Sequence, residues 1–129
     1  MRPKVLIVDD DPLMHLLYMP HLERAGYHPI SANDGGQVLF LAAQESPAVI
    51  VMDVMMTNMD GLAALRELRQ FDTTKHIPVI VITSNVSILS IVRHEALASG
   101  ASALLPKPFS PAQLVDEVRK LAPVPSKKP

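Results

Sequence analysis

Three carboxylates stand at the ends of short apolar segments, and these residues are the best suited to chemistry. Asp9 and Asp10 follow the apolar segment 5–8, and Asp53 follows the segment 48–52. Carboxylates gathered in one place repel one another and raise each other's pKa unless a cation lies among them. Because all the ligands would be oxygen atoms, Mg²⁺ is the expected ion and Mn²⁺ the alternative.

Polar residues also follow two later apolar segments. Thr83, Ser84 and Asn85 come directly after the run that begins at Pro78, and Lys107 stands between two prolines, which fix where its side chain points. A lysine could help Mg²⁺ to offset the negative charge of the three aspartates. Magnesium keeps part of its water shell and is often completed by a phosphate oxygen. These residues therefore suit a phosphoryl group.

A phosphoryl group on Asp53 would replace the carboxylate charge with about −2. The Thr83 hydroxyl is the nearest polar group that could respond to this change. A hydrogen bond to a charged partner contributes about 1.5 to 3 kcal/mol, which is enough to shift a two-state equilibrium. The residues therefore predict a switch as well as a binding site.

These residues must be positioned by alternating strands and helices. Apolar runs of strand length recur with helix-sized segments between them, which is typical of βα units around a buried parallel sheet. The expected strands are 4–9, 29–32, 48–53, 78–83 and 103–105. The expected helices are 12–25, 34–45, 61–71, 86–99 and 111–122.

Capping residues mark the ends of these helices. Asp11-Pro12 and Ser110-Pro111 are start signals, since a capping oxygen precedes a proline at the first helical position. Asn33-Asp34 predicts the start of the second helix, and Gly26 and Gly100 predict helix stops. Pro20 lies inside the first helix, where we expect a kink but no break.

The five predicted βα units form one α/β domain, residues 1–122, followed by a flexible tail or linker, 123–129. In an open parallel sheet, ligands bind at the carboxyl ends of the strands. Asp9, Asp53, Thr83 and Lys107 all lie at or just after such ends. We therefore expect these four side chains to converge.

Composition excludes several classes of protein. The 129 residues include no cysteine, which excludes disulfides and thiolate metal sites. No apolar run reaches the length of a membrane span and no signal peptide is evident, so we expect a cytoplasmic protein without membrane association.

The net charge is −1, and the basic cluster Lys127-Lys128 is too small for us to expect nucleic-acid binding by this chain. The five histidines lack metal-ligand spacing and are expected to be surface or half-buried residues.

The sequence resembles the receiver domain of two-component response regulators, over residues 4 to about 122. The resemblance rests on five motifs in family order. These are Val5-Leu6-Ile7-Val8-Asp9-Asp10, Val51-Met52-Asp53-Val54-Met55-Met56 with Met59-Asp60-Gly61, Ile77-Pro78-Val79-Ile80-Val81-Ile82-Thr83, Gly100-Ala101, and Lys107-Pro108-Phe109. The resemblance implies a flavodoxin-like (βα)5 fold, a doubly wound five-stranded parallel sheet in the order 2-1-3-4-5.

The resemblance also implies roles for single residues. Asp53 would be the phosphoacceptor, and Asp9, Asp10, Asp53 and the backbone carbonyl of Met55 would hold Mg²⁺. Thr83 would be the switch hydroxyl and Lys107 would pair with the phosphoryl group, with a cis peptide bond between Lys107 and Pro108. Ser84 adds a hydroxyl near this site, and Met55 and Asn85 would flank the phosphoryl group.

This chain departs from the family pattern at three positions. Leu104 stands where receivers commonly carry an aromatic switch residue, Thr57 replaces a usual proline, and Ser84 replaces a common alanine. Signalling through a rotating aromatic ring is therefore not expected. We also expect the Met55 side chain to hinder the hydrolytic water and to lengthen the life of the phosphoryl group.

Three other functions fit parts of the sequence. An FMN-binding flavodoxin would need a phosphate-binding loop where Asp9-Asp10-Asp11-Pro12 stands. A haloacid-dehalogenase-like phosphatase would need an acid at Met55 to protonate the leaving group. A receiver-like adaptor that works without phosphorylation needs no residue that this sequence lacks, and it stays the alternative.

The favoured function is a phosphorelay switch and not an enzyme with a separate substrate. Asp53 would take a phosphoryl group from a histidine kinase or phosphotransfer partner in a self-catalysed, Mg²⁺-dependent step and lose it by autodephosphorylation. Output would reach a downstream protein or an effector domain outside this chain. The protein would act as a monomer, or as a dimer when phosphorylated, through the face formed by 86–99, 103–105 and 111–122, which includes Ile91 and Leu104.

Overall fold

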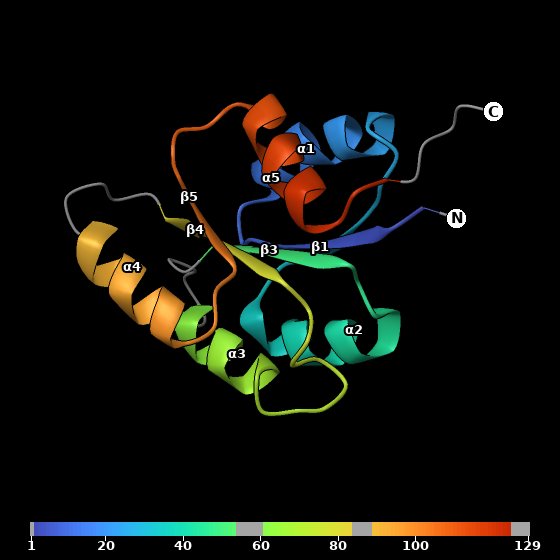
Figure 1. Cartoon of the computed structure of the whole chain (residues 1–129). Helices are drawn as coiled ribbons and strands as arrows, with labels where there is room; N and C mark the ends of the chain where they lie inside the picture. The colour runs from blue at the N-terminus through green and yellow to red at the C-terminus, as the bar shows by residue number, and fades with distance from the viewer. Residues whose placement is uncertain (1, 54–60, 84–88, 125–129) are drawn as a thin grey trace.

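The computed structural model describes residues 2–53, 61–83 and 89–124. Five parallel strands form one sheet in the order β2-β1-β3-β4-β5, which confirms the predicted fold class (Figure 1). Each strand agrees with its predicted range to within one residue at either end. The strands are β1 (Lys4–Val8), β2 (His28–Ala32), β3 (Val49–Asp53), β4 (Val79–Thr83) and β5 (Ala103–Pro106).

The three central strands are buried on both faces, which explains their uninterrupted apolar sequences. β3 and β4 are buried along their whole length, and in β1 only the first residue is partly exposed. β3 lies between β1 and β4, with Val8 opposite Met52 and Asp53 opposite Ile82. The carboxyl ends of β1, β3 and β4 therefore lie side by side.

Five α-helices connect and cover the strands. Their starts at Pro12, Gly61 and Pro111 are as predicted, and Pro20 is accommodated inside an unbroken helix. Asp11 and Ser110 cap their helices with side-chain oxygens, and Gly26 and Gly100 adopt the positive φ angles of 102° and 106° that favour glycine at a helix stop. The helices are α1 (Pro12–Arg24), α2 (Val38–Glu45), α3 (Gly61–Leu68), α4 (Leu89–Ala98) and α5 (Pro111–Leu121).

The structure corrects two predicted helix boundaries. The helix expected from residue 34 begins at Val38, because the glycine pair Gly35-Gly36 favours a short 3-10 turn, η1 (Gly35–Gln37), over α-helix. The helix expected to reach residue 71 ends at Leu68, where the Thr74 hydroxyl donates to the Leu68 carbonyl at 2.7 Å. The residues that directly precede α3 and α4, 54–60 and 84–88, lie outside the described residues.

The helices form two layers with the sheet between them (Figure 1). α1 and α5 cover one face, where Tyr18, Leu22 and Leu114 pack against Val5 and Ile7. α2, α3 and α4 cover the other face, where side chains of all three helices pack against Leu6, Val8 and their neighbours.

The packed core extends toward the end of the described chain. Val124 packs against the core beside Gly26, so ordered packing continues past residue 122. The division into a domain 1–122 and a tail 123–129 stays a prediction.

Within the described residues, no helix combines the length and the apolar character needed to cross a membrane.

Candidate functional site

Two buried carboxylates meet at the carboxyl edge of the sheet. Asp53 is the last residue of β3, and Asp9 follows the last residue of the adjacent strand β1. Their exposed fractions are only 5% and 3%. A buried carboxylate is costly unless a cation or hydrogen-bond donors stabilise it, so this edge must provide one or both.

Lys107 provides the cation. Its Nζ atom donates to Asp53 Oδ2 at 2.9 Å and lies 4.0 Å from Asp9 Oδ2. The backbone amide of Lys107 donates to the Thr83 carbonyl at 2.7 Å, which ties the loop after β5 to the end of β4. The peptide bond between Lys107 and Pro108 is cis, as the family resemblance predicted.

The pKa values of Asp9 and Lys107 are both raised at this edge. Burial raises the pKa of Asp9, the negative charge of Asp53 raises it further, and the Asp11 amide, which donates to Asp9 Oδ1 at 2.9 Å, opposes the shift. Burial by itself would lower the pKa of Lys107, but the hydrogen bond and charge of Asp53 overcome this effect and raise it. Lys107 therefore stays protonated at neutral pH and faces the carboxylates as a fixed positive charge.

Thr83 completes the described part of this edge. The side chain is buried, and its Oγ1 atom has no hydrogen-bond partner among the described residues. A buried hydroxyl without a partner costs about 1 to 3 kcal/mol, so such groups are rare and call for an explanation. The hydroxyl is suited to bond with a group that enters the site.

The donor set fits a hard cation. Asp9 and Asp53 are oxygen donors from adjacent strands, and Asp10 is half-buried directly after Asp9. Across the described residues, however, no three His, Asp or Glu side chains are gathered around one position as metal ligands. The structure brings together Asp9, Asp53 and Lys107, and the role of Asp10 as a further metal ligand stays a prediction. The lysine already supplies positive charge between the two buried carboxylates.

His15 is a residue of this edge that the sequence interpretation missed. It is only 7% exposed, which corrects the expectation of a surface or half-buried residue. Its Nε2 atom lies 2.8 Å from the backbone carbonyl oxygen of Asp9. His15, Tyr18 and Leu22 share the buried face of α1 at spacings of three and four residues, and this period could have shown that the ring points inward.

Several predicted site residues cannot be placed. Met55, Ser84 and Asn85 lie outside the described residues, as does Thr57. Leu104 is half-buried on β5 and packs against the core on the α3 side of the sheet. On the other side, the ring of Phe109, two residues after Lys107, stacks on Tyr18 at a centroid distance of 5.2 Å.

The chain is similar to known proteins in sequence and in fold. The family model of the response regulator receiver domain matches residues 5–119. This chain belongs to the response regulator receiver domain family. Receiver domains are phosphoacceptors of two-component systems, and the family binds Mg²⁺ in its active site. The FMN-binding and phosphatase alternatives are thereby set aside.

Similar proteins include regulators that are longer than this chain. The receiver domain is 34% identical over 119 residues to the transcriptional regulatory protein BaeR of Escherichia coli, covering 92% of this chain and 48% of BaeR. It is 38% identical over 121 residues to the response regulator PleD of Caulobacter vibrioides, covering 94% of this chain and 26% of PleD. The chain therefore spans about half or less of the length of these relatives.

Solved structures of single receiver domains match over nearly their whole length. The chemotaxis response regulator CheY4 of Vibrio cholerae superposes with a TM-score of 0.85 at 30% identity, covering 94% of this chain and 99% of CheY4. The receiver domain of the sensor histidine kinase PA1611 of Pseudomonas aeruginosa superposes with a TM-score of 0.83 at 28% identity, covering 94% of this chain and 98% of that domain. The PA1611 structure has a magnesium ion coordinated in its active site cleft.

Proposed function

We propose that Asp53 is the phosphoacceptor of this receiver domain and that its modification changes the interaction surface of the protein. The observation that carries this proposal is the 2.9 Å bond between the Lys107 ammonium and the buried Asp53 carboxylate at the end of β3. The bond orients the carboxylate and places a positive charge where phosphoryl oxygens would arrive.

The transfer itself is a displacement at phosphorus. A carboxylate oxygen of Asp53 forms the new P–O bond while the bond between phosphorus and the donor breaks. With a phosphohistidine donor, the P–N bond breaks and the imidazole leaves with the electron pair and takes up a proton. Lys107 then exchanges its contact with the carboxylate for the phosphoryl oxygens. Water reverses the modification by hydrolysis.

The metal ligands would be Asp9, Asp10, Asp53 and the backbone carbonyl of Met55, with Mg²⁺ as the ion and Mn²⁺ as a substitute. When bound, the ion offsets charge on the transferring phosphoryl group. Asp9 is held for this task by the Asp11 amide, which donates to its Oδ1 atom at 2.9 Å. Because Lys107 lies 4.0 Å from Asp9 Oδ2, a change at either group is felt by the other.

The switch would begin at Thr83. Its hydroxyl has no partner in the described part of the chain, and a phosphoryl oxygen on Asp53 would supply one. The same residue is bonded through its carbonyl to the Lys107 amide, so movement of Thr83 is transmitted to the loop after β5. The half-buried Leu104 would transmit this movement by repacking, without the rotation of an aromatic ring. Ser84 and Asn85 would flank the same group.

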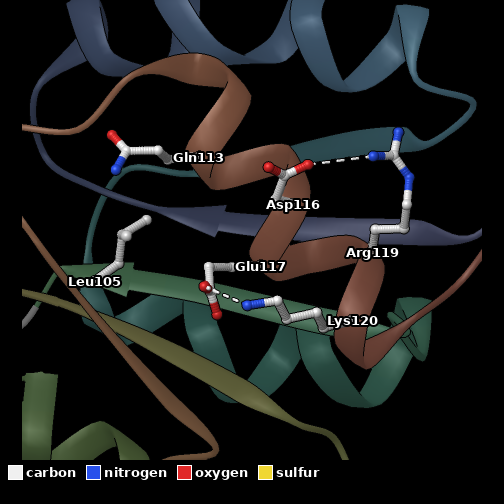
Figure 2. A pocket seen from close by; sticks show the side chains of 6 residues that line it. All are labelled: Leu105, Gln113, Asp116, Glu117, Arg119 and Lys120. Carbon is white, nitrogen blue, oxygen red and sulfur yellow. Dashed lines mark hydrogen bonds and ion pairs between the residues drawn. The ribbon is translucent and has the colours of Figure 1, made fainter.

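The output surface would be the face formed by α4, β5 and α5. A shallow pocket of about 400 Å³ lies on this face between Leu105 and the outer side of α5 (Figure 2). Ion pairs join Asp116 to Arg119 at 3.4 Å and Glu117 to Lys120 at 3.2 Å. Three of these charged side chains are exposed and Glu117 is half-buried, and they could exchange partners with a downstream protein, an effector domain or a second copy of the chain. A change from monomer to dimer on phosphorylation is the simplest such response.

A phosphodonor protein would cover a different surface. The outer face of α1 carries Leu13, Leu16 and Leu17, which are among the most exposed large apolar side chains of the described residues. α1 begins two residues after Asp10. A histidine kinase or phosphotransfer protein that approaches Asp53 can therefore contact these leucines. Scattered exposed leucines are common, but three on one helix face beside a reactive site indicate a contact surface.

Intact mass measurement tests the phosphoacceptor directly. The protein is incubated with Mg²⁺ and acetyl phosphate, and we expect the mass of one phosphoryl group to be added. Asp53→Asn should gain none, whereas Asp72→Asn, a change at an exposed acid paired with Lys75, should behave like the unmodified chain. Absence of the adduct from the unmodified chain, repeated with a phosphohistidine protein as donor, would favour the adaptor that works without phosphorylation.

The lifetime of the adduct tests the role of Met55. We propose that its apolar side chain hinders the hydrolytic water, so Met55→Asn should accelerate loss of the phosphoryl group after the donor is removed. An unchanged rate of loss would refute this role without affecting the assignment of Asp53.

A further inference from the structure

The buried ring of His15 holds the turn that presents the acidic residues. Its Nε2 atom lies 2.8 Å from the carbonyl oxygen of Asp9, six residues earlier in the chain. Because a carbonyl oxygen can only accept, Nε2 carries the proton and donates it. The other ring nitrogen, Nδ1, is buried and has no partner among the described residues. The hydrogen bond to Asp9 is therefore the polar contact that compensates for burying this ring on an apolar helix face.

The Asp9 carbonyl needs this donor because of its place in the chain. The registered pairs of β1 with both of its neighbours end at Val8, so the carbonyl of Asp9 lies beyond the sheet ladder. The carbonyl belongs to the peptide unit that joins Asp9 to Asp10. A bond to its oxygen therefore fixes the direction in which the chain leaves β1 and the position from which Asp10 starts.

Two other bonds hold the same residue. The Asp9 amide donates to the Ala32 carbonyl at 3.1 Å, and the Asp11 amide donates to Asp9 Oδ1 at 2.9 Å. His15 adds the third bond and is the one that comes from a side chain of α1. It thus connects the orientation of the acidic turn to the packing of α1 on the sheet.

We propose that His15 is a positioning residue for the cation site of this chain, acting through the Asp9 carbonyl and without contact to the ion. The inference rests on the proposed function, since it assumes that Asp9 and Asp10 hold Mg²⁺. Mutation of residues that hydrogen-bond to metal ligands and orient them typically weakens metal binding about 10- to 100-fold. Loss of the His15 donor should loosen the turn and weaken Mg²⁺ binding.

Two variants distinguish the loss of the hydrogen-bond donor from the loss of the volume of the ring. His15→Leu fills a similar space without a donor, and His15→Gln can place an amide N–H near the position of Nε2. In an NMR titration of the ¹⁵N-labelled full chain with MgCl₂, we expect the Kd to rise roughly 10-fold in His15→Leu and to stay within about 2-fold in His15→Gln. His21→Leu, a change at a half-buried histidine on the same helix, is the matched control and should leave the Kd unchanged.

A second measurement needs no variant. The ¹⁵N shifts of the His15 ring in the unmodified chain should show that Nε2 carries a proton, as a donor to the Asp9 carbonyl must. A ring protonated on Nδ1 alone would overturn the proposal, because Nε2 could not donate to Asp9.

The outcomes distinguish this inference from the proposed function. If the unmodified chain binds Mg²⁺ and takes a phosphoryl group while His15→Leu binds Mg²⁺ equally well, the role of His15 is refuted and the function stands. The role is also refuted if His15→Gln is as weak as His15→Leu. If the unmodified chain binds no Mg²⁺, both proposals fail together.

Discussion

The two edges of the sheet differ in whether their polar groups have hydrogen-bond partners. At the amino edge, the Arg69 guanidinium donates to the carbonyls of Gly100, Ile77 and Lys75 at 2.7 to 3.1 Å. The Tyr27 hydroxyl donates to the Ala122 carbonyl at 2.7 Å, 95 residues away in the chain. Arg69 thus satisfies carbonyls of segments that lead into β4 and β5, and Tyr27 satisfies the carbonyl that follows α5.

The carboxyl edge leaves comparable groups unsatisfied. Thr83 Oγ1 and His15 Nδ1 are the two buried side-chain atoms without a hydrogen-bond partner in the described part of the molecule, and both lie at this edge. Burial and the charge of Asp53 raise the pKa of Asp9 at the same edge. The amino edge is thus arranged for stability, whereas the carboxyl edge retains energetic conflicts that a ligand can relieve, as expected of a functional site.

The largest expected effect is at the amino edge, on removal of Arg69. Arg69→Ala should lower the free energy of unfolding by about 3 kcal/mol, because several partly buried carbonyls lose a charged donor. Arg66→Ala is the matched control, since Arg66 on the same segment makes one exposed contact of 3.4 Å to Ser99. Urea denaturation of both variants measures the difference. Equal losses would show that the Arg69 bonds contribute little.

Two threonines give the most direct test of the comparison. Thr74 at the amino edge and Thr83 at the carboxyl edge are both 1% exposed, but only the Thr74 hydroxyl donates to a carbonyl, that of Leu68. Thr74→Val should therefore cost about 1.5 kcal/mol, whereas Thr83→Val should stabilise the fold by about 1 kcal/mol in the absence of a phosphoryl donor, because it removes a buried hydroxyl that has no partner among the described residues. Urea denaturation of the two variants would contradict the comparison if Thr83→Val cost as much as Thr74→Val.

The Tyr27 hydroxyl makes stability depend on alkaline pH. Burial raises its pKa above the reference value of 10.0, although the charge of Arg119 opposes the shift. The contribution is therefore fully present below pH 10 and is lost as the pH rises through the raised pKa. Tyr27→Phe should cost about 1 kcal/mol at pH 7, and the difference from the unmodified chain should shrink above pH 10. A difference independent of pH in denaturation experiments would refute the assignment.

The smallest effect is expected at the carboxyl edge, on removal of the Asp9 charge. Because the folded pKa of Asp9 is raised above 3.8, its ionised form destabilises the fold at neutral pH. Without divalent metal, Asp9→Asn should gain up to about 1 kcal/mol at pH 7, and this gain should disappear as the pH falls below the reference pKa. The same change at exposed Asp72 should leave stability unchanged. A loss of stability in Asp9→Asn would show that the carboxylate is fully compensated.

Much of this site could be predicted from local patterns. Asp9, Asp53, Thr83 and Lys107 each follow an apolar run, and parallel strands end at one edge, so their convergence follows from the repeated βα pattern. The start signals at Asp11 and Ser110 also act as predicted, because a capping bond depends on residues two or three positions away.

Other features depended on contacts between distant segments. His15 was expected to be outside the core, although it bonds to Asp9 and shares the buried face of α1. The stabilising role of Arg69 could not be predicted from the sequence. A guanidinium stabilises the fold in this way only when carbonyls from other loops lie around it. The start of α2 was misplaced because the glycines at 35 and 36 favour a turn over a capped helix.

The sequence by itself determined the alternation of strands and helices and the residue types available for phosphoryl chemistry. These properties follow from hydrophobic period and from side-chain composition, which are local. The tertiary structure decided which polar groups are satisfied and which are not, since a hydrogen bond across the fold exists only when distant segments meet. That distribution separates the stable amino edge from the carboxyl edge, where Lys107 meets Asp53 and the Thr83 hydroxyl lies buried without a partner among the described residues.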